Sequence, residues 1–250
     1  MELRLPDGLP SELDRFEGKA HGDHPPLKYM IQVITEDLIE DAVQHMTKYF
    51  LVRENILSSA AYLEDSVSMK VCHDLWRKIL KVGVGLVALV ELNEDGETKK
   101  KVAGINLTTI ANLDDEKNSK DELLKLQGKA VKKTVRTVID LEKDVDIASL
   151  YGTRKYLTAY GLSVAPQYSG DGVGYRLLMA RTPLCRALGI RLTVTAFTSP
   201  LSQYLAKKAG FETVTSLDYK TYKHGDKLAY PRLDGSIALM AKRIPASCEL

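Results

Sequence analysis

Hydrophobic residues form short runs along the chain that alternate with amphipathic stretches. The continuous apolar run Val84–Leu92 has the length of a buried strand, and Val102–Ile110 has the composition of a second one. The turn-forming residues Glu94-Asp95-Gly96-Glu97 lie between them, so the two runs predict a long hairpin. Enrichment in β-branched and aromatic residues predicts further strands at 29–34, 156–164, 190–197, 212–219 and 236–243.

Apolar residues that recur every three or four positions predict helices between these strands. Residues 35–50 show this spacing, with Thr35 as a capping residue and acidic side chains in the first turn. A polar break at 52–55 follows, and a charged loop is expected at 112–120. The same spacing predicts helices at 58–80, 122–139, 142–150, 173–188 and 199–209, the last of them ended by Gly210.

The second half of the chain alternates strand, helix, strand, helix, strand. This order predicts an α/β sandwich in which part of the sheet is parallel. Four of the nine prolines lie in the first 27 residues, which are therefore predicted to form an extended lead-in at 1–27. Because no internal repeat or low-complexity linker interrupts the remainder, we expect a single domain at 28–250.

The composition is that of a globular protein, because 44% of the residues are hydrophobic and 27% are charged. No apolar run approaches the ~20 residues that span a bilayer. The first residues lack the apolar core of a secretory signal. The 35 basic and 33 acidic residues leave a net charge of +2, which is too balanced to indicate nucleic-acid binding. We therefore expect neither a membrane nor a nucleic acid as partner.

The cysteines and histidines indicate no special chemistry. Cys72, Cys185 and Cys248 are far apart and predict no disulfide framework, which favours a reducing compartment, the cytoplasm. A lone cysteine is more often a small buried hydrophobic residue than a nucleophile, which needs an open, electropositive setting. The five histidines lack the spacing of metal ligands, so no metal is expected.

Three alternate glycines lie between a predicted strand and a predicted helix, in the stretch VAPQYSGDGVG at 164–174. Glycine allows a close backbone approach, and the N–H groups at a helix start attract an anion such as a pyrophosphate. The stretch lacks the Gly-Lys-Ser/Thr ending of a Walker loop and the G-x-G-x-x-G spacing of a dinucleotide fingerprint. A tight turn without any ligand is the alternative.

The segment LSVAPQYSGDGVGYRLL at 162–178 resembles the acetyl-CoA signature of the GNAT superfamily of acetyltransferases. That signature reads Arg/Gln-x-x-Gly-x-Gly/Ala after an apolar strand. SPLSQYLAKKAGF at 199–211 resembles the helix that follows in the same family, at the family's spacing. Ser169 departs from the signature, because it stands where the family prefers Arg or Gln. The backbone N–H groups do not need that side chain, but one contact to the pyrophosphate would be lost.

Three further features are similar to insect-type arylalkylamine N-acetyltransferases. They are YFLVRENIL at 49–57, the hydroxyl cluster of Thr198, Ser199 and Ser202, and the closing SIALMAKRI at 236–244. The resemblance extends over residues 29–244. It implies a mixed α/β fold with a mostly antiparallel central sheet, which is flanked by helices and splayed at the cofactor strand.

The resemblance also implies acetyl-CoA as a co-substrate and no metal. The backbone of one strand would bind its acetyl and pantetheine portions, and the glycine loop would bind its pyrophosphate. The residues expected to bind it are Leu162, Ser163, Val164, Gln167, Ser169, Gly170, Asp171, Gly172, Val173, Gly174, Ser199 and Tyr204.

Acetyl transfer to an amine requires that the amine, with a pKa near the ~10.4 of lysine, loses a proton. By the resemblance Glu54 is the general base, and the alternative is a surface loop glutamate. Thr198 and Ser202 are the candidate catalytic hydroxyls. The tyrosine with which many GNAT enzymes protonate the leaving thiolate is replaced here by Ala206. Ser202 has the alternative role of a hydroxyl that bonds the backbone in a first helical turn.

The resemblance thus implies a cytoplasmic, monomeric enzyme that acetylates the primary amine of a small arylalkylamine. Polyamines, agmatine and longer acyl groups are alternative substrates. A second hypothesis is a GNAT-fold protein that binds acyl-CoA with little turnover. A lysine acetyltransferase is a third and weaker one, since no strongly acidic segment is available to attract basic tails.

Overall fold

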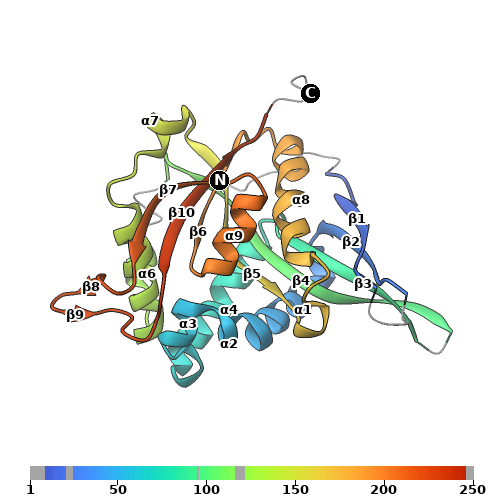
Figure 1. Ribbon diagram of the computed structural model, residues 1–250, viewed down its shortest axis with the longest axis horizontal. Coiled ribbons are helices and arrows are strands. Elements are labelled where there is room, and N and C mark those ends of the chain that lie inside the picture. The colour runs from blue at the N-terminus through green and yellow to red at the C-terminus, as the bar shows by residue number, and fades with distance from the viewer. Residues whose placement is uncertain (1–8, 21–24, 95, 116–121, 246–250) are drawn as a thin grey trace.

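The computed structural model describes residues 9–20, 25–94, 96–115 and 122–245 of the chain. At its centre is an eight-stranded sheet in the order β1-β2-β3-β4-β5-β6-β10-β7 (Figure 1). The strands of this sheet are β1 (Asp14–Glu17), β2 (Lys28–Val33), β3 (Leu86–Glu94), β4 (Glu97–Asn112), β5 (Lys155–Val164), β6 (Leu192–Phe197), β7 (Glu212–Asp218) and β10 (Ser236–Arg243). A separate short sheet pairs β8 (Lys223–His224) with β9 (Lys227–Leu228).

Neighbouring strands of the large sheet are antiparallel, except β5 and β6, which run parallel. The ladder between β5 and β6 contains the pair Leu157↔Thr193 alone, although both strands lie wholly within the described residues. The expected mixed, mostly antiparallel sheet is therefore confirmed. It is splayed where β5 and β6 part.

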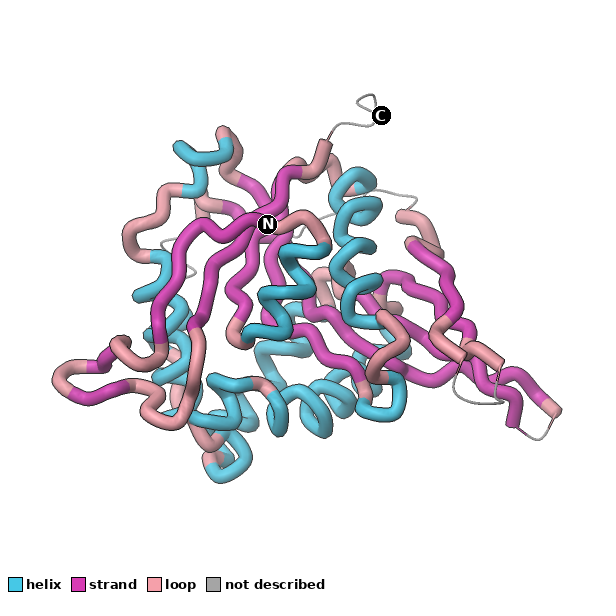
Figure 2. The backbone as a smooth tube through the Cα atoms, in the orientation of Figure 1, coloured by secondary structure: helices cyan, strands magenta, loops and turns pink. Residues whose placement is uncertain are grey.

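Helices lie on both faces of this sheet (Figure 2). Alternate residues of β3 show the two layers, because Leu86 and Ala88 belong to the core beneath α8, whereas Val87 and Leu89 belong to the core with α1 and α4. Burial on both faces explains why residues 84–90 of this run carry no polar side chain. The helical segments are η1 (Glu36–Leu38), α1 (Ile39–His45), η2 (Met46–Phe50), α2 (Leu51–Arg53), α3 (Asn55–Ser59), η3 (Tyr62–Glu64), α4 (Ser66–Leu80), α6 (Lys129–Glu142), α7 (Ile147–Tyr151), η4 (Pro166–Tyr168), α8 (Val173–Ala187) and α9 (Pro200–Lys208).

The predicted helix at 58–80 is wrong in its first part. Ala61 has a positive φ of 56°, and α4 begins only after Asp65, whose carboxylate accepts a hydrogen bond from the Ser68 N–H at 3.0 Å. The predicted helices at 122–139 and 142–150 are also displaced, because α6 continues to Glu142 and α7 begins at Ile147.

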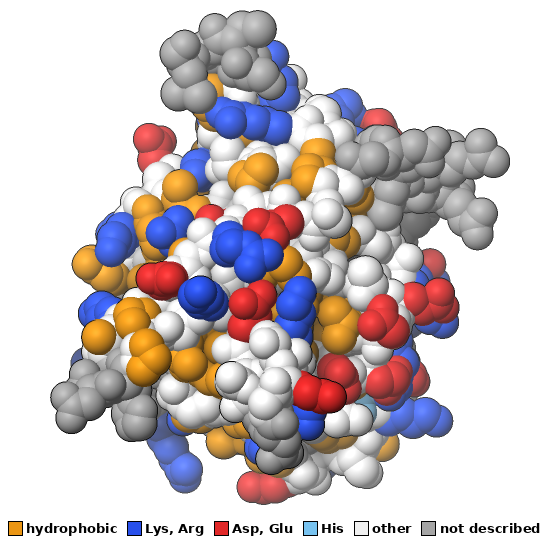
Figure 3. All heavy atoms as spheres, turned by 90° about the vertical axis from the view of Figure 1, so that its right-hand side faces the viewer, with side chains coloured by type: hydrophobic (Ala, Val, Ile, Leu, Met, Phe, Trp, Pro, Cys, Tyr) orange, Lys and Arg blue, Asp and Glu red, His pale blue; other side chains and the backbone are white. Residues whose placement is uncertain are grey.

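Residues 14–17 of the expected extended lead-in are extended, and as β1 they pair with β2 at the edge of the sheet. Phe16 is buried there against Tyr29, with ring centroids 5.0 Å apart. Cys248, residues 116–120 of the expected charged loop and residues 1–8 lie outside the described residues. Among the described helices, none has both the length and the apolar composition that crossing a bilayer requires. Acidic and basic side chains are interspersed on the face shown in Figure 3.

Candidate active site

The splayed end of β5 leaves backbone groups outside the sheet ladder. The Ala165 N–H donates to the Ala103 carbonyl of β4 at 2.9 Å, so alternate residues upstream of Ala165 also face β4. The backbone groups of Leu162 and Val164 therefore face the opposite edge, where β6 has departed. They are available to a ligand that runs along this edge.

The glycine loop leads from β5 into α8. Gly170 and Gly172 have positive φ values of 98° and 83°, a conformation that favours glycine. Gly172 is the N-cap of the 15-residue helix α8 and supplies no side-chain cap, so the N–H groups of the first turn are not capped by it. Gln167 and Ser169 are exposed in this loop. An uncapped helix start behind a glycine turn fits an anionic group.

The side chain of Asp171 points into the protein and away from any anion at the loop. Tyr29 Oη donates to its Oδ2 at 2.5 Å, and the Lys19 N–H lies 3.4 Å from its Oδ1. Asp171 is only 6% exposed. It therefore anchors the glycine loop to β2 and to the segment after β1, and its own contribution to a ligand is limited to its backbone.

Glu54 lies between α2 and α3 and caps α3. Its Oε2 accepts a hydrogen bond from the Leu57 N–H at 2.6 Å. Its Oε1 is buried and has no hydrogen-bond partner among the described residues. Burial raises the pKa of Glu54, and the Thr198 hydroxyl and the N–H groups of Leu57 and Ile56 oppose that rise. A buried carboxylate oxygen without a partner can accept a proton from a ligand.

The segment that carries Glu54 connects the separated ends of β5 and β6. Near β5, a Cβ on Gly161 would lie 2.6 Å from Met46 Cε and 2.8 Å from Phe50 Cζ, so η2 presses directly on this strand. At the end of β6, Asn55 Nδ2 donates to the Thr198 carbonyl at 3.1 Å. Glu54 is thus held next to Thr198, at the edge where the two strands part.

Three buried tyrosines are close enough to Glu54 for its charge to act on their hydroxyls. Tyr62, Tyr219 and Tyr230 are buried, and the charge of Glu54 adds to the effect of burial in raising the pKa of each hydroxyl. Tyr219 Oη donates to the Thr198 carbonyl at 2.8 Å. The sequence analysis did not identify Tyr219 and Tyr230, because they flank an irregular segment that comes near Glu54 only in the folded chain.

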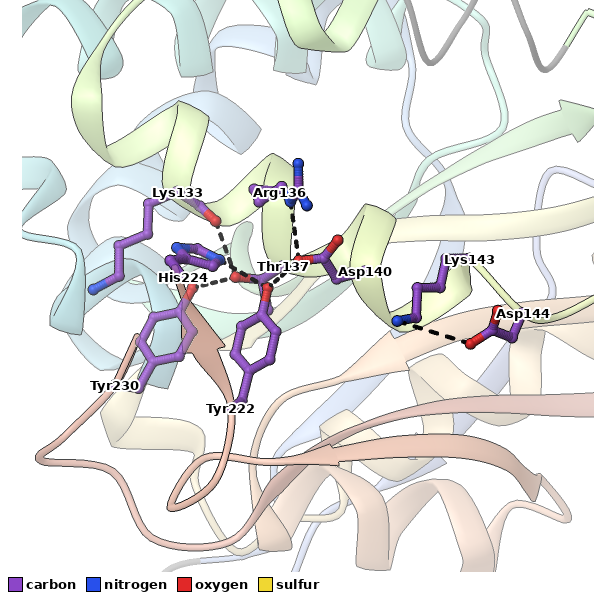
Figure 4. Close-up of polar contacts among 9 residues, drawn as sticks. All are labelled: Lys133, Arg136, Thr137, Asp140, Lys143, Asp144, Tyr222, His224 and Tyr230. Atoms are coloured by element: carbon purple, nitrogen blue, oxygen red, sulfur yellow. Dashed lines mark hydrogen bonds and ion pairs between the residues drawn. The ribbon is translucent and has the colours of Figure 1, made fainter. Parts of the chain in front are cut away.

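Figure 4 shows how the segment with Tyr230 is attached to α6. The hydroxyls of Tyr230 and Thr137 lie 2.7 Å apart. Tyr222 Oη donates to Asp140 Oδ2 at 2.8 Å and lies 2.7 Å from His224 Nε2. These contacts fix the residues between β7 and β10 against the helix.

Ser199 and Ser202 form a capping box at the start of α9. Ser202 Oγ donates to the Ser199 carbonyl at 2.9 Å and accepts from the Ser199 N–H at 3.1 Å. The single hydroxyl proton of Ser202 is therefore engaged in the cap. Tyr204, one turn along the helix, is 62% exposed.

The structure thus brings together Glu54, Thr198 and the open edge of β5, with the glycine loop at the other end of that edge. Ser163 faces β4 opposite Ile105 and is buried, unlike its two neighbours on β5. A Cβ placed on Gly174 would lie 3.6 Å from Val164 Cγ2, which is ordinary van der Waals contact. Among the described residues there is no group of three or more His, Cys, Asp or Glu side chains that could hold a metal ion.

Comparison with protein-family models and with curated proteins gives no match. Among solved structures, a protein of the yellow fever mosquito Aedes aegypti assigned as arylalkylamine N-acetyltransferase 7 is 29% identical to this chain. It covers 97% of this chain, which in turn covers 98% of it, with a TM-score of 0.84. The chain is an acyltransferase of the GNAT fold.

Two further structures show the same fold. Arylalkylamine N-acetyltransferase 2 of Aedes aegypti is 18% identical over 87% of this chain and 99% of its own, with a TM-score of 0.75. A polyamine N-acetyltransferase of Drosophila melanogaster is 16% identical over 86% of this chain and 100% of its own, with a TM-score of 0.71. The resemblance to insect arylalkylamine N-acetyltransferases is thereby confirmed.

Proposed function

We propose that this acyltransferase moves an acetyl group directly from acetyl-CoA to the primary amine of a small arylalkylamine, with Glu54 as the general base. The observation that carries the proposal is the buried, unpartnered Oε1 of Glu54 at the edge where β5 and β6 part. The likeness to the mosquito arylalkylamine N-acetyltransferase 7 supports the amine as acceptor.

Acetyl-CoA fits the open edge of β5. The free backbone groups of Leu162 and Val164 would pair with its acetyl and pantetheine portions. The N–H groups between Ser169 and Gly174 would bind its pyrophosphate, helped by the dipole of α8. Ser199 and Tyr204 on α9 would flank the bound cofactor. Asp171 contributes indirectly, because it fixes the loop through Tyr29.

In the reaction, Glu54 takes a proton from the ammonium form of the substrate, directly or through a water molecule. Its raised pKa makes it a stronger base than an ordinary glutamate. The amine nitrogen then attacks the thioester carbon, and the bond from that carbon to sulfur breaks. The Leu162 N–H stabilises the negative charge that builds on the thioester oxygen. The nitrogen loses its second proton as the amide forms, and the leaving thiolate gains one. We assign this transfer to the Thr198 hydroxyl, which also interacts with Glu54, because the proton of Ser202 is engaged in the cap.

Tyr62, Tyr219 and Tyr230 around Glu54 favour an aromatic amine over a purely aliphatic one. The buried rings give the surroundings of Glu54 an aromatic and apolar character, which suits an aryl group better than a second cation. Agmatine and polyamines are the second substrate class. The assay below includes them because of the structural likeness to the Drosophila polyamine N-acetyltransferase.

The proposal includes a monomer in the cytoplasm, without a nucleic acid or membrane as partner. Cys72 and Cys185 support a reducing compartment, because both are buried and neither forms a disulfide within the part of the chain that the structure describes. Size-exclusion chromatography with light scattering, together with fractionation of cells that express the protein, tests both points.

A single assay tests the reaction. The purified full chain is mixed with acetyl-CoA and with tryptamine, tyramine, dopamine, serotonin, agmatine or spermidine, and released thiol is measured. We expect thiol release with the aromatic amines, and a fall in kcat of about 100-fold or more in Glu54→Ala at unchanged CoA affinity. Binding of CoA without thiol release from any amine would leave the acyl-CoA-binding hypothesis, and failure to bind CoA would reject both.

A further inference from the structure

Arg181 of α8 carries a positive charge into the centre of the molecule. Its side chain is 1% exposed. Its Nε donates to Asn106 Oδ1 at 2.8 Å and its Nη1 to Thr195 Oγ1 at 2.7 Å, and its guanidinium lies 5.7 Å from the centre of the Phe211 ring. In the described part of the chain these hydrogen-bond partners are neutral, so no carboxylate cancels the charge.

Asn106 connects Arg181 to the splayed strand β5. It lies in β4, and its Nδ2 donates to the Gly161 carbonyl of β5 at 2.8 Å. The register between β4 and β5 shifts at this point, between the pairs Asn106↔Leu162 and Thr108↔Ala159. The asparagine side chain therefore supplies the donor that the regular ladder lacks at the irregularity.

The carbonyl of Gly161 and the N–H of Leu162 belong to the same peptide group. Because a trans peptide is planar, its carbonyl and its N–H point in opposite directions. Holding the carbonyl on the β4 side therefore turns the Leu162 N–H toward the open edge of β5. The contact of Met46 and Phe50 with Gly161 restricts the same peptide from the other face of the sheet.

We propose that Arg181 and Asn106 are positioning residues for acyl transfer, which hold and polarise the Gly161–Leu162 peptide so that its N–H binds the thioester oxygen. This inference rests on the proposed function. Each hydrogen bond in the series from Arg181 through Asn106 to Gly161 draws electron density toward the guanidinium, which makes the Leu162 N–H a stronger donor. Burial lowers the pKa of Arg181 to about 10, so the side chain remains a cation at neutral pH.

The energetics agree with a functional role. A buried charge without an ionised partner costs stability, and an apolar side chain of similar volume would often be as stable. The charge is useful when negative charge develops nearby, as it does on the thioester oxygen during transfer. A preorganised donor in a site from which water is excluded gives the largest benefit.

The decisive variant is Asn106→Asp. Aspartate keeps an oxygen for Arg181, so the guanidinium is not left unpaired, but an ionised carboxylate cannot donate to the Gly161 carbonyl. Arg181→Met removes the charge while it keeps the length of the side chain. Thr195→Val is the matched control, because it removes the other strong hydrogen bond of Arg181 and leaves Asn106 in place.

The main measurement is the infrared stretch of the thioester carbonyl of acetyl-CoA, labelled with carbon-13 and bound to the full chain without amine. We expect the wild-type protein to lower this frequency relative to free acetyl-CoA. Asn106→Asp should return it most of the way, Arg181→Met part of the way, and Thr195→Val hardly at all. We also expect kcat to fall about ten-fold or more in Asn106→Asp, with little change in the affinity for free CoA, which lacks the thioester carbonyl of the acetyl group.

A folded Asn106→Asp variant with the wild-type frequency and kcat would overturn the inference. So would a Thr195→Val variant that moves the band as far as Asn106→Asp does, because the effect would then come from loosened packing. If Arg181→Met does not fold, Asn106→Asp and its control decide alone. Failure of the wild-type protein to bind acetyl-CoA would instead reject the proposed function, whereas transfer that all three variants preserve would reject only the positioning roles.

Discussion

The two carboxylate oxygens of Glu54 lie in different surroundings. Oε2 accepts the Leu57 N–H and caps α3, whereas Oε1 is buried without a partner among the described residues. One oxygen thus fixes the side chain and the other is left for a proton. A glutamine in this position keeps the capping oxygen and loses the basic one, so Glu54→Gln separates the two roles.

For Glu54→Gln we expect kcat/KM to fall roughly 100-fold or more, because the general base is lost. Since burial raises the pKa of Glu54 above its ordinary 4.5, the folded state holds this proton more tightly than the unfolded state. Ionisation above pH 4.5 therefore costs stability, and the cost grows as the pH rises through the raised pKa. Urea unfolding from pH 4 to pH 8 should show this loss in the wild-type protein and its absence in the variant. If the free energy of unfolding changed with pH in the same way in both proteins, the raised pKa of Glu54 would be contradicted.

His45 gives a stability prediction of opposite sign. Burial lowers its pKa to about 4, so the folded state prefers the neutral ring. Its contribution is fully present above the unfolded pKa of ~6.5 and is lost as the pH falls toward 4. The difference corresponds to about 3 kcal/mol. In His45→Phe, which can keep the edge contact with Tyr49, we expect the free energy of unfolding to fall less between pH 6.5 and pH 4. If the free energy of unfolding of His45→Phe fell as much between pH 6.5 and pH 4 as that of the wild-type protein, His45 would be excluded as the cause of the acid sensitivity.

At the scale of single elements, the capping box of α9 tests the role of Ser202. Ser202→Ala removes the hydroxyl that bonds both the N–H and the carbonyl of Ser199, and we expect a loss of about 1 kcal/mol in stability. If the hydroxyl only caps the helix, kcat measured well below the melting temperature stays close to the wild-type value. A fall in kcat beyond that of Thr198→Val would instead favour Ser202 as the proton donor to the thiolate.

The glycine loop depends on its anchor to β2. Tyr29→Phe removes the hydrogen bond to Asp171 and leaves the carboxylate buried without that donor. We expect stability to fall by about 1–3 kcal/mol, and CoA to bind several-fold more weakly because the N–H groups of the loop lose their fixed orientation. Calorimetry with CoA measures the affinity. Tyr151→Phe is the control, because Tyr151 ends α7, which precedes β5, whereas the glycine loop follows that strand. Unchanged CoA affinity in Tyr29→Phe would show that the loop keeps its geometry without the anchor.

At the scale of the whole molecule, local patterns in the sequence predict the elements better than the contacts between them. The apolar run at 84–92 predicts β3, and the glycines at 170–174 predict the turn before α8. Asp65 interrupts the predicted helix at 58–80, and its Oδ2 accepts a hydrogen bond from the Lys129 N–H at 2.7 Å. Local sequence does not reveal this contact, because the two residues are far apart along the chain. Arg181 shares the apolar face of its helix with Leu177 and Leu184, so the sequence pattern places a cation in the core. Only the fold shows that Asn106 and Thr195 bind it. The residues around Glu54 are likewise brought together by tertiary contacts.

The segment between β7 and β10 is the clearest case of a long-range contact with a functional consequence. It carries Tyr230 toward Glu54, and α6 holds it through the Tyr222 hydroxyl on Asp140 (Figure 4). If this attachment shapes the amine site, Tyr222→Phe should raise the KM for the amine roughly five-fold, the equivalent of one hydrogen bond of ~1 kcal/mol. CoA affinity should stay unchanged, because the glycine loop lies elsewhere in the molecule.

Arg136→Gln is the matched control for Tyr222→Phe, because Arg136 binds the same Asp140 oxygen at 3.0 Å from an exposed position. An exposed ion pair contributes little, so we expect the KM of this variant to stay near the wild-type value. Steady-state kinetics with the best amine from the panel, run beside CoA calorimetry, measures both effects. If Tyr222→Phe weakens CoA binding as much as it raises the amine KM, the segment supports the whole domain and not the amine site. If neither quantity changes, packing of the Tyr222 ring against Tyr230 alone holds the segment in place.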